Sequence, residues 1–136
     1  MEVSTEKIMI LLQRRYSAIR ELDRLTRELE ETIVRNDGIS AAMVLQMRGD
    51  EMEKAERCME EIWQMGESSG EAYEKVCSLV TSDLDTAVGE TKEEEKIFEI
   101  RRKTQTVIDS LRRTDQRLNF KVAGEKSFYK TEGLAT

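Results

Sequence analysis

Histidine is absent from the 136-residue chain, and this absence excludes a large share of enzyme chemistry. Without it the chain has no Ser-His-Asp triad, no Cys-His pair and no histidine ligand for zinc or di-iron. Two cysteines are too few for a four-cysteine zinc site. The phosphate-binding motifs G-x-x-x-x-G-K and G-x-G-x-x-G are absent as well. We therefore expect a non-enzymatic protein with no catalytic residues, no metal site and no cofactor.

Proline is also absent, and aromatic residues make up only 5% of the chain, while charged residues make up 37%. This combination favours long α-helices and disfavours a β-sandwich, which needs aromatic and β-branched residues in its strands. A chain of this length forms one domain and buries roughly 68% of its unfolded surface. The composition therefore predicts a single all-helical domain with a true core.

Long hydrophobic runs are missing too. The longest, IMILL at residues 8–12, is far shorter than the roughly 20 residues of a membrane span and too short for the apolar region of a signal peptide. Cys58 and Cys77 fall at helical, partly apolar positions. Two such cysteines are typical of reduced thiols, so we expect a cytoplasmic protein with no membrane contact.

A coiled-coil seam is the strongest pattern present, and it predicts a long first helix. Its members alternate at spacings of four and three residues. Ser4 or Thr5 should begin this helix, and NDG at residues 36–38 should end it, with Asn36 or Gly38 in the left-handed conformation. The seam consists of Ile8, Leu12, Arg15, Ile19, Leu22, Thr26, Leu29 and Ile33, flanked by Leu11, Ala18 and Leu25.

A second helix is predicted from Ser40, a good N-cap, to the interruption GESSG at residues 66–70. Methionine is concentrated in this helix, where it suits both ordinary core filling and a surface that accepts varied apolar partners. Met43, Val44 and Met47 lie off the seam, so the helix that packs on the seam would not bury their side chains. The predicted seam consists of Ala41, Leu45, Arg48, Met52, Ala55, Met59 and Ile62.

Two further helical patterns complete the chain. One covers residues 71–88, with a weak point at its TSD tripeptide, and the other covers residues 90–117. Because Gly89 only weakens a helix, the third and fourth patterns could also form one continuous helix. We predict one all-α domain over residues 1–117, an antiparallel bundle or hairpin of three to four helices with a long first helix. Residues 118–136 are predicted to form an extended, partly ordered C-terminal tail that is not helical.

Charge is unevenly distributed along the chain, whose net charge is −6. Residues 67–96 are acidic and residues 97–117 are basic. This pattern leaves three alternatives: the two segments attract each other, they contact a partner with a polarised surface, or each forms a solvated helix face. A nucleic-acid-binding regulator is the least favoured function, because no aromatic side chain interrupts the basic segment and Asp109 lies on its basic face.

Two stretches, NDGISAAMVLQMR at residues 36–48 and GEKSFYK at residues 124–130, carry a family resemblance. A heptad-patterned first helix, a short break, a Met-rich helix and a last helix that leads into an aromatic tail resemble the small flagellar export chaperones of the FlgN and FliT type. The resemblance lies in architecture, size and acidity over most of the chain. It implies a cytoplasmic, non-enzymatic chaperone that holds the amphipathic terminal helix of a hook-associated or filament-cap subunit with its last helix and tail.

We therefore predict a chaperone or adaptor that binds an amphipathic helix of a protein client in an apolar groove. The alternative is a structural coiled-coil homodimer through the first helix, in which Arg15 and Thr26 set the register. The tail could pack on its own bundle through Phe120 and Val122, form a disordered terminus or act as a recognition segment. The predicted partner-binding residues are Met43, Met47, Val107, Leu111, Phe120, Phe128 and Tyr129.

Overall fold

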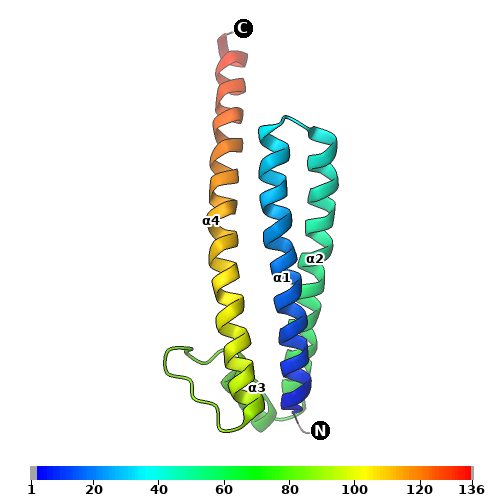
Figure 1. Ribbon diagram of the computed structural model, residues 1–136, viewed down its shortest axis with the longest axis vertical. Coiled ribbons are helices and arrows are strands. Elements are labelled where there is room, and N and C mark those ends of the chain that lie inside the picture. Colours follow the sequence, from blue (N-terminus) through cyan, green and yellow to red (C-terminus); the bar gives the residue numbers. More distant parts are fainter. Residues whose placement is uncertain (1–2, 136) are drawn as a thin grey trace.

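The protein is described by a computed structural model that covers residues 3–135, with side chains through Lys121, and the described part contains helices and no strand. Figure 1 shows α1 between α2 and α4, with the three helices lying lengthwise and the short α3 beside them at one end. All elements are helical, and α2 runs antiparallel to its neighbours α1 and α4. The predicted all-α antiparallel bundle is therefore confirmed. The elements are α1 (Thr5–Val34), α2 (Gly38–Met65), the 3-10 turn η1 (Gly66–Ser68), α3 (Gly70–Val80) and α4 (Lys92–Ala135).

The first helix begins where the sequence predicts. Ser4 is its N-cap, and its hydroxyl oxygen accepts a hydrogen bond from the backbone N–H of Lys7 at 3.1 Å. The apolar seam faces inward, and even the polar seam residue Thr26 is fully buried, where its hydroxyl donates to the Leu22 carbonyl at 2.7 Å. The seam is therefore used inside one chain, where α1 packs against both α2 and α4.

The turn between α1 and α2 also follows the sequence, with one correction. Asn36 adopts the left-handed conformation, with φ of 59°, as predicted for this position. The N-cap of α2 is Asp37 and not Ser40, because the Asp37 carboxylate accepts the Ser40 N–H at 3.1 Å and the helix begins at Gly38. An aspartate three residues earlier is an equally good cap, and here it is Asp37 that caps the helix.

The third helix is shorter than predicted and is not continuous with the fourth. It ends at Val80, where the Thr81 hydroxyl donates to the Cys77 carbonyl at 2.7 Å. Side-chain bonds of this kind compete with helix extension. Arg101 then holds the following loop, since its guanidinium donates to the carbonyl of Leu79 at 3.1 Å and to the carbonyl of Ser82 at 2.6 Å.

Replacing Arg101 by methionine is expected to loosen this loop and to lower the free energy of unfolding by about 1–3 kcal/mol, because two partly buried carbonyls lose a charged donor. Urea unfolding and the rate of proteolytic cleavage within residues 81–91 measure the two effects. Arg102→Met is the matched control, because Arg102 is exposed and makes a single 3.2 Å bond to the Leu84 carbonyl. Equal behaviour of the two variants would contradict the role assigned to Arg101.

The fourth helix differs from the prediction at its end, because it does not stop at residue 117 but remains helical to Ala135. No proline interrupts this segment, and a single glycine costs a helix only about 1 kcal/mol. Leu118 is buried, so the bundle extends past the predicted boundary, whereas Phe120 is 82% exposed and does not cover the bundle end. The side chain of Val122 lies outside the described residues.

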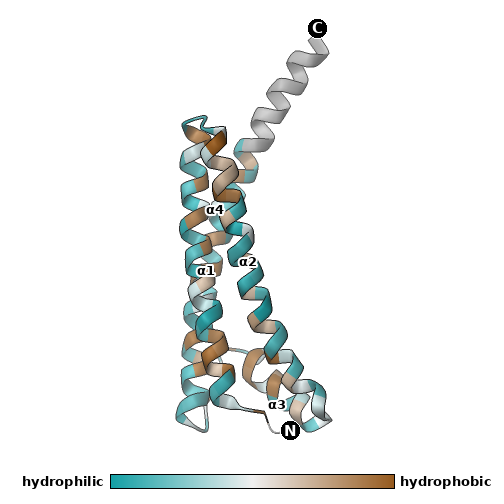
Figure 2. Ribbon diagram, turned by 90° about the vertical axis from the view of Figure 1, so that its right-hand side faces the viewer, coloured by the Kyte–Doolittle hydropathy of each residue, from teal (hydrophilic) through white to brown (hydrophobic). Residues whose placement is uncertain are grey.

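Hydrophobic packing is concentrated at the two ends of the bundle, and Figure 2 shows the hydrophobic segments gathered there. The lower cluster joins all four helices, and the upper cluster joins α1, α2 and α4. Among residues 3–135 no helix is both long enough and apolar enough to cross a membrane. The lower cluster comprises Ile8, Leu11, Leu12, Ile62, Val76, Leu79, Ile97, Phe98 and Ile100, and the upper comprises Leu25, Leu29, Val44 and Leu118.

Candidate functional site

A groove opens between the two hydrophobic clusters. Although α2 and α4 both pack on α1, their Cα atoms stay more than 8 Å apart throughout the described residues. The groove between them has a volume of ≈ 620 Å³. Its floor is Arg15, Ile19 and Leu22 of α1, its α4 wall is Ile108 and Leu111, and its α2 side is Met52, Ala55, Glu56, Met59, Glu60, Trp63 and Gln64, with Glu67 beyond.

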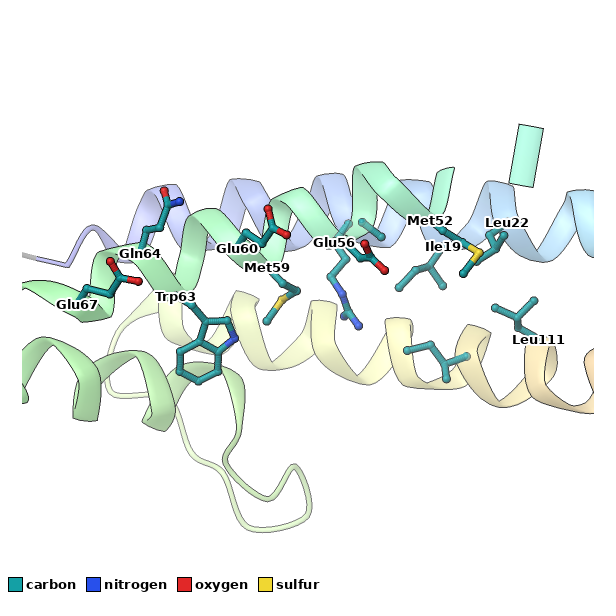
Figure 3. A pocket seen from close by; sticks show the side chains of 13 residues that line it. Ile19, Leu22, Met52, Glu56, Met59, Glu60, Trp63, Gln64, Glu67 and Leu111 are labelled. Carbon is teal, nitrogen blue, oxygen red and sulfur yellow. The ribbon is translucent and has the colours of Figure 1, made fainter. Parts of the chain in front are cut away.

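The α2 wall is the middle of the predicted seam. Met52 and Met59 are seven residues apart, and Met52 is 47% exposed. Figure 3 shows Met59 and Trp63 projecting from α2 across the groove toward the helix that carries Leu111. A seam that is buried in a closed bundle is here covered only at its ends. The arrangement is therefore that of a bundle with one long side open.

Both ends of the groove are closed by contacts between helices. At the upper end Arg48 of α2 pairs with Asp115 of α4 at 3.2 Å. At the lower end the ring of Trp63 lies 6.0 Å from that of Tyr73 on α3. A smaller cavity of ≈ 180 Å³ shares Arg15 with the groove and extends it toward the loop after α3. The open length therefore follows the helix axes between two fixed contacts.

Among the side chains that the structure describes, Arg15 is the only positive charge on the lining of the groove. Burial lowers the pKa of its guanidinium from the ordinary value, although an arginine stays charged. No hydrogen bond or ion pair joins it to another residue of the described chain. The acidic side chains Glu56, Glu60 and Glu67 stand along the opposite, α2 side and are exposed. The groove thus combines apolar walls, a cationic floor and an acidic rim.

The predicted partner-binding residues are not gathered in one place. Of the set, Leu111 lines the groove and is buried on its floor side. Val107, one turn earlier on α4, instead borders a polar depression beside α1. Met43 and Met47 are exposed on α2, at 62% and 45%, but neither lines the groove.

Of the three aromatic residues of the predicted tail, only Phe120 has a side chain within the described residues. Phe120 is exposed and does not line the groove. The side chains of Phe128 and Tyr129 lie outside the described residues, so their role stays a prediction. Among the groove residues that the prediction missed, Met52 and Met59 are seam residues. Their spacing indicated a core, and spacing alone does not show that the described helices leave one side of them open.

Among the described residues, no acidic side chain of residues 67–96 pairs with a basic side chain of residues 97–117. Within the acidic segment Lys75 of α3 pairs with Glu94 of α4 at 3.0 Å, and the carboxylate pKa of Glu94 is lowered chiefly by this hydrogen bond. In the basic segment Arg117 pairs with Glu30 of α1 at 3.3 Å, and Lys103 pairs with Glu99 at 3.4 Å. Together with Arg101, these side chains form bonds within the chain. Fewer basic side chains remain to contact phosphates, which disfavours nucleic-acid binding.

Comparison with family models, with curated proteins and with solved structures finds no match for the chain. Within the described residues no group of three or more histidine, cysteine, aspartate or glutamate side chains is arranged to hold a metal ion. Both cysteines are free of disulfide bonds. The site can therefore be interpreted only from its own chemistry, which is that of an elongated apolar groove with a charged floor and rim.

Proposed function

We propose that this protein is a chaperone or adaptor whose groove between α2 and α4 receives an amphipathic helix of a protein client. The observation that carries the proposal is the open seam of α2, with Met52 and Met59 at heptad spacing opposite Leu111. Amphipathic helices bind grooves of this kind through apolar anchors one and two turns apart. A helix laid in the groove would complete a four-helix bundle.

The composition of the walls supports this choice of ligand. Methionine side chains are flexible, so they adapt to anchors of different shape, and a tryptophan adds a large apolar surface at one end. Burial of apolar surface contributes about 25 cal/mol per Å², which makes a continuous apolar stripe on the client the main source of affinity. In the resting protein the exposed stripe is the kind of surface that marks a binding site.

The more specific client class comes from the sequence resemblance. A flagellar hook-associated or filament subunit has the required terminal helix by that resemblance, and the binding event would then take place in the cytoplasm without catalysis. The groove supports the general mode of binding, and the resemblance alone supports the flagellar client. The two parts of the proposal can therefore be tested separately.

Site-specific photocrosslinking tests the binding mode. A photoreactive phenylalanine analogue at position 52 should crosslink to a client in living cells, and the same analogue at position 43 should not, because Met43 is exposed but does not line the groove. Mass spectrometry of the crosslinked segment should identify an amphipathic helix. Equal crosslinking at both positions, or a crosslinked segment without an apolar stripe, would contradict helix binding in the groove.

The same experiment tests the C-terminal segment in a chain that ends at Lys121. This boundary keeps the buried Leu118 and the contact of Lys121 with Glu30 at 3.7 Å, which truncation after residue 117 would remove. If crosslinking at position 52 persists in the shortened chain, Phe128 and Tyr129 are not needed for binding.

A homodimer through the first helix is the second candidate, and the fold disfavours it. The α1 seam is already buried within the chain, as Ile8 and Leu12 at 0% and 3% exposure illustrate. Pairing two α1 seams would require the bundle to open and expose both hydrophobic clusters. Sedimentation equilibrium at several concentrations distinguishes a monomer from such a dimer.

A further inference from the structure

We propose that the helix received by the groove carries a carboxylate within its apolar stripe, which pairs with Arg15, and basic residues along the flank that faces the α2 rim. This inference rests on the proposed helix-binding function and specifies the chemistry of the partner. It makes Arg15 a specificity-determining residue.

The position of Arg15 is the first observation. It occupies a seam position of α1 between Leu12 and Ile19, so its backbone lies on the floor and its side chain enters the space between α2 and α4. It lines both the groove and the smaller cavity that continues it. Neighbouring Arg14 faces elsewhere and borders a depression on the other side of the α1–α2 pair.

The lack of a partner for Arg15 is the second observation. Other inward arginines of this protein have bonded partners: Arg48 pairs with Asp115, and Arg101 donates to the carbonyls of Leu79 and Ser82. A guanidinium presents five N–H donors, and those of Arg15 face solvent in the open groove, because the one buried side-chain nitrogen without a partner among the described residues is Nε of Arg48. A bound helix that excludes this water without supplying an acceptor would leave the donors unpaired, which is unfavourable. A carboxylate from an incoming helix would satisfy these donors through two parallel hydrogen bonds.

The acidic rim on the α2 side is the third observation. It determines the charge that the partner helix should carry on the flank beside its apolar stripe. Glu56 and Glu60 are one turn apart on α2 and exposed, and like charges at this spacing repel. No ion pair involves Glu56, Glu60 or Glu67 within the described chain. Lysine or arginine on the flank of a bound helix would neutralise them. The same rim disfavours an anionic lipid surface, which would bring further negative charge.

The partner is therefore a helix with one acid inside its apolar stripe and bases beside it. Complementary charges of this kind select partners and orient them in the groove. A helix with lysine at the internal position would place two cations together in a partly buried site. Such a helix should be excluded even when its apolar residues fit.

Synthetic peptides provide the probe. Each is about 20 residues long, long enough to span the groove as a helix, with leucine at heptad positions and lysine on one flank. One set carries glutamate at a single position of the apolar stripe, in each of three registers, and the matched set carries glutamine there. Fluorescence anisotropy measures binding to the full-length protein and to its variants.

We expect the wild type to bind the best glutamate peptide about tenfold more tightly than its glutamine partner, the size of a charged hydrogen-bonded contact. Arg15→Gln should bind both peptides with similar affinity. Arg14→Gln, which removes a neighbouring charge outside the groove, should keep the preference. Circular dichroism confirms that both variants remain folded.

The outcomes separate this inference from the proposed function. Equal affinity of the wild type for the two peptides would overturn the acid preference and leave helix binding standing. Binding of neither peptide, together with no crosslink at position 52, would overturn both. Displacement of the peptides by dodecanoate, lost in Arg15→Gln, would assign Arg15 to a fatty-acid carboxylate and overturn the helix partner. A dimer seen in sedimentation and lost in Arg15→Gln would show that a second copy of the chain occupies the groove, and it would overturn the client helix as the partner.

Discussion

Replacing Ile62 by alanine is expected to lower the free energy of unfolding by about 2–5 kcal/mol, whereas the same replacement at Ile39 should change it by less than about 0.5 kcal/mol. Both isoleucines lie on α2, so helix propensity affects them alike. Ile62 is fully buried, and Ile39 is 81% exposed. Urea unfolding followed by far-ultraviolet circular dichroism measures both changes.

The reason for the difference is the lower hydrophobic cluster. Ile62 packs there with Leu12 of α1, Val76 of α3 and Ile97 of α4, so one truncation removes contacts to three helices and leaves a cavity. A loss below about 1 kcal/mol at Ile62 would mean that α2 does not contribute to this cluster. A large loss at Ile39 would place that residue in a contact that the fold does not contain.

Replacing Met52 by glutamate should weaken binding of the client helix at least about 100-fold, whereas Met43→Glu should change the affinity by less than about threefold. Both methionines are exposed on α2, so neither change removes a core residue. Only Met52 lines the groove. A carboxylate there would be buried against the apolar stripe of the client and would stand one turn from Glu56.

Anisotropy titration with the crosslinked client segment, or with the best glutamate peptide, measures the two affinities. The free protein should unfold at nearly the same urea concentration in both variants, which separates binding from stability. Similar affinities for Met52→Glu and Met43→Glu would mean that the helix binds elsewhere, and the outer face with Met43 and Met47 would then be the place to test next.

The first helix was predictable because its signals are local and agree with one another. A Ser4 cap, a regular seam and the NDG break each follow from a few adjacent residues, and the structure contains all three. Where two local signals competed, the prediction was wrong in detail: Asp37 took the cap expected of Ser40, and the third helix ended at Val80. Small differences in local hydrogen bonding decide such boundaries.

The site was less predictable, because a seam position has the same spacing whether its partner is inside the chain or outside it. Leu111, predicted to bind a partner, lines the groove, whereas Met43 and Met47, which were predicted because they lie off the seam, do not. The groove instead uses the seam residues Met52 and Met59, which the spacing pattern assigned to the core. Heptad spacing identifies an apolar stripe but not the helix that covers it.

By itself the sequence determined the fold class of this protein: the lack of proline, the low aromatic content and the heptad seam dictate an all-helical chain, and the lack of histidine excludes sites built on that residue. Only the tertiary structure decided that α1 lies between α2 and α4, and that those two helices stay apart. Helix formation depends on neighbours a few residues away, whereas the placing of α4 depends on the loop that Arg101 holds and on two distant apolar clusters. The open groove, with Arg15 on its floor, follows from that placing.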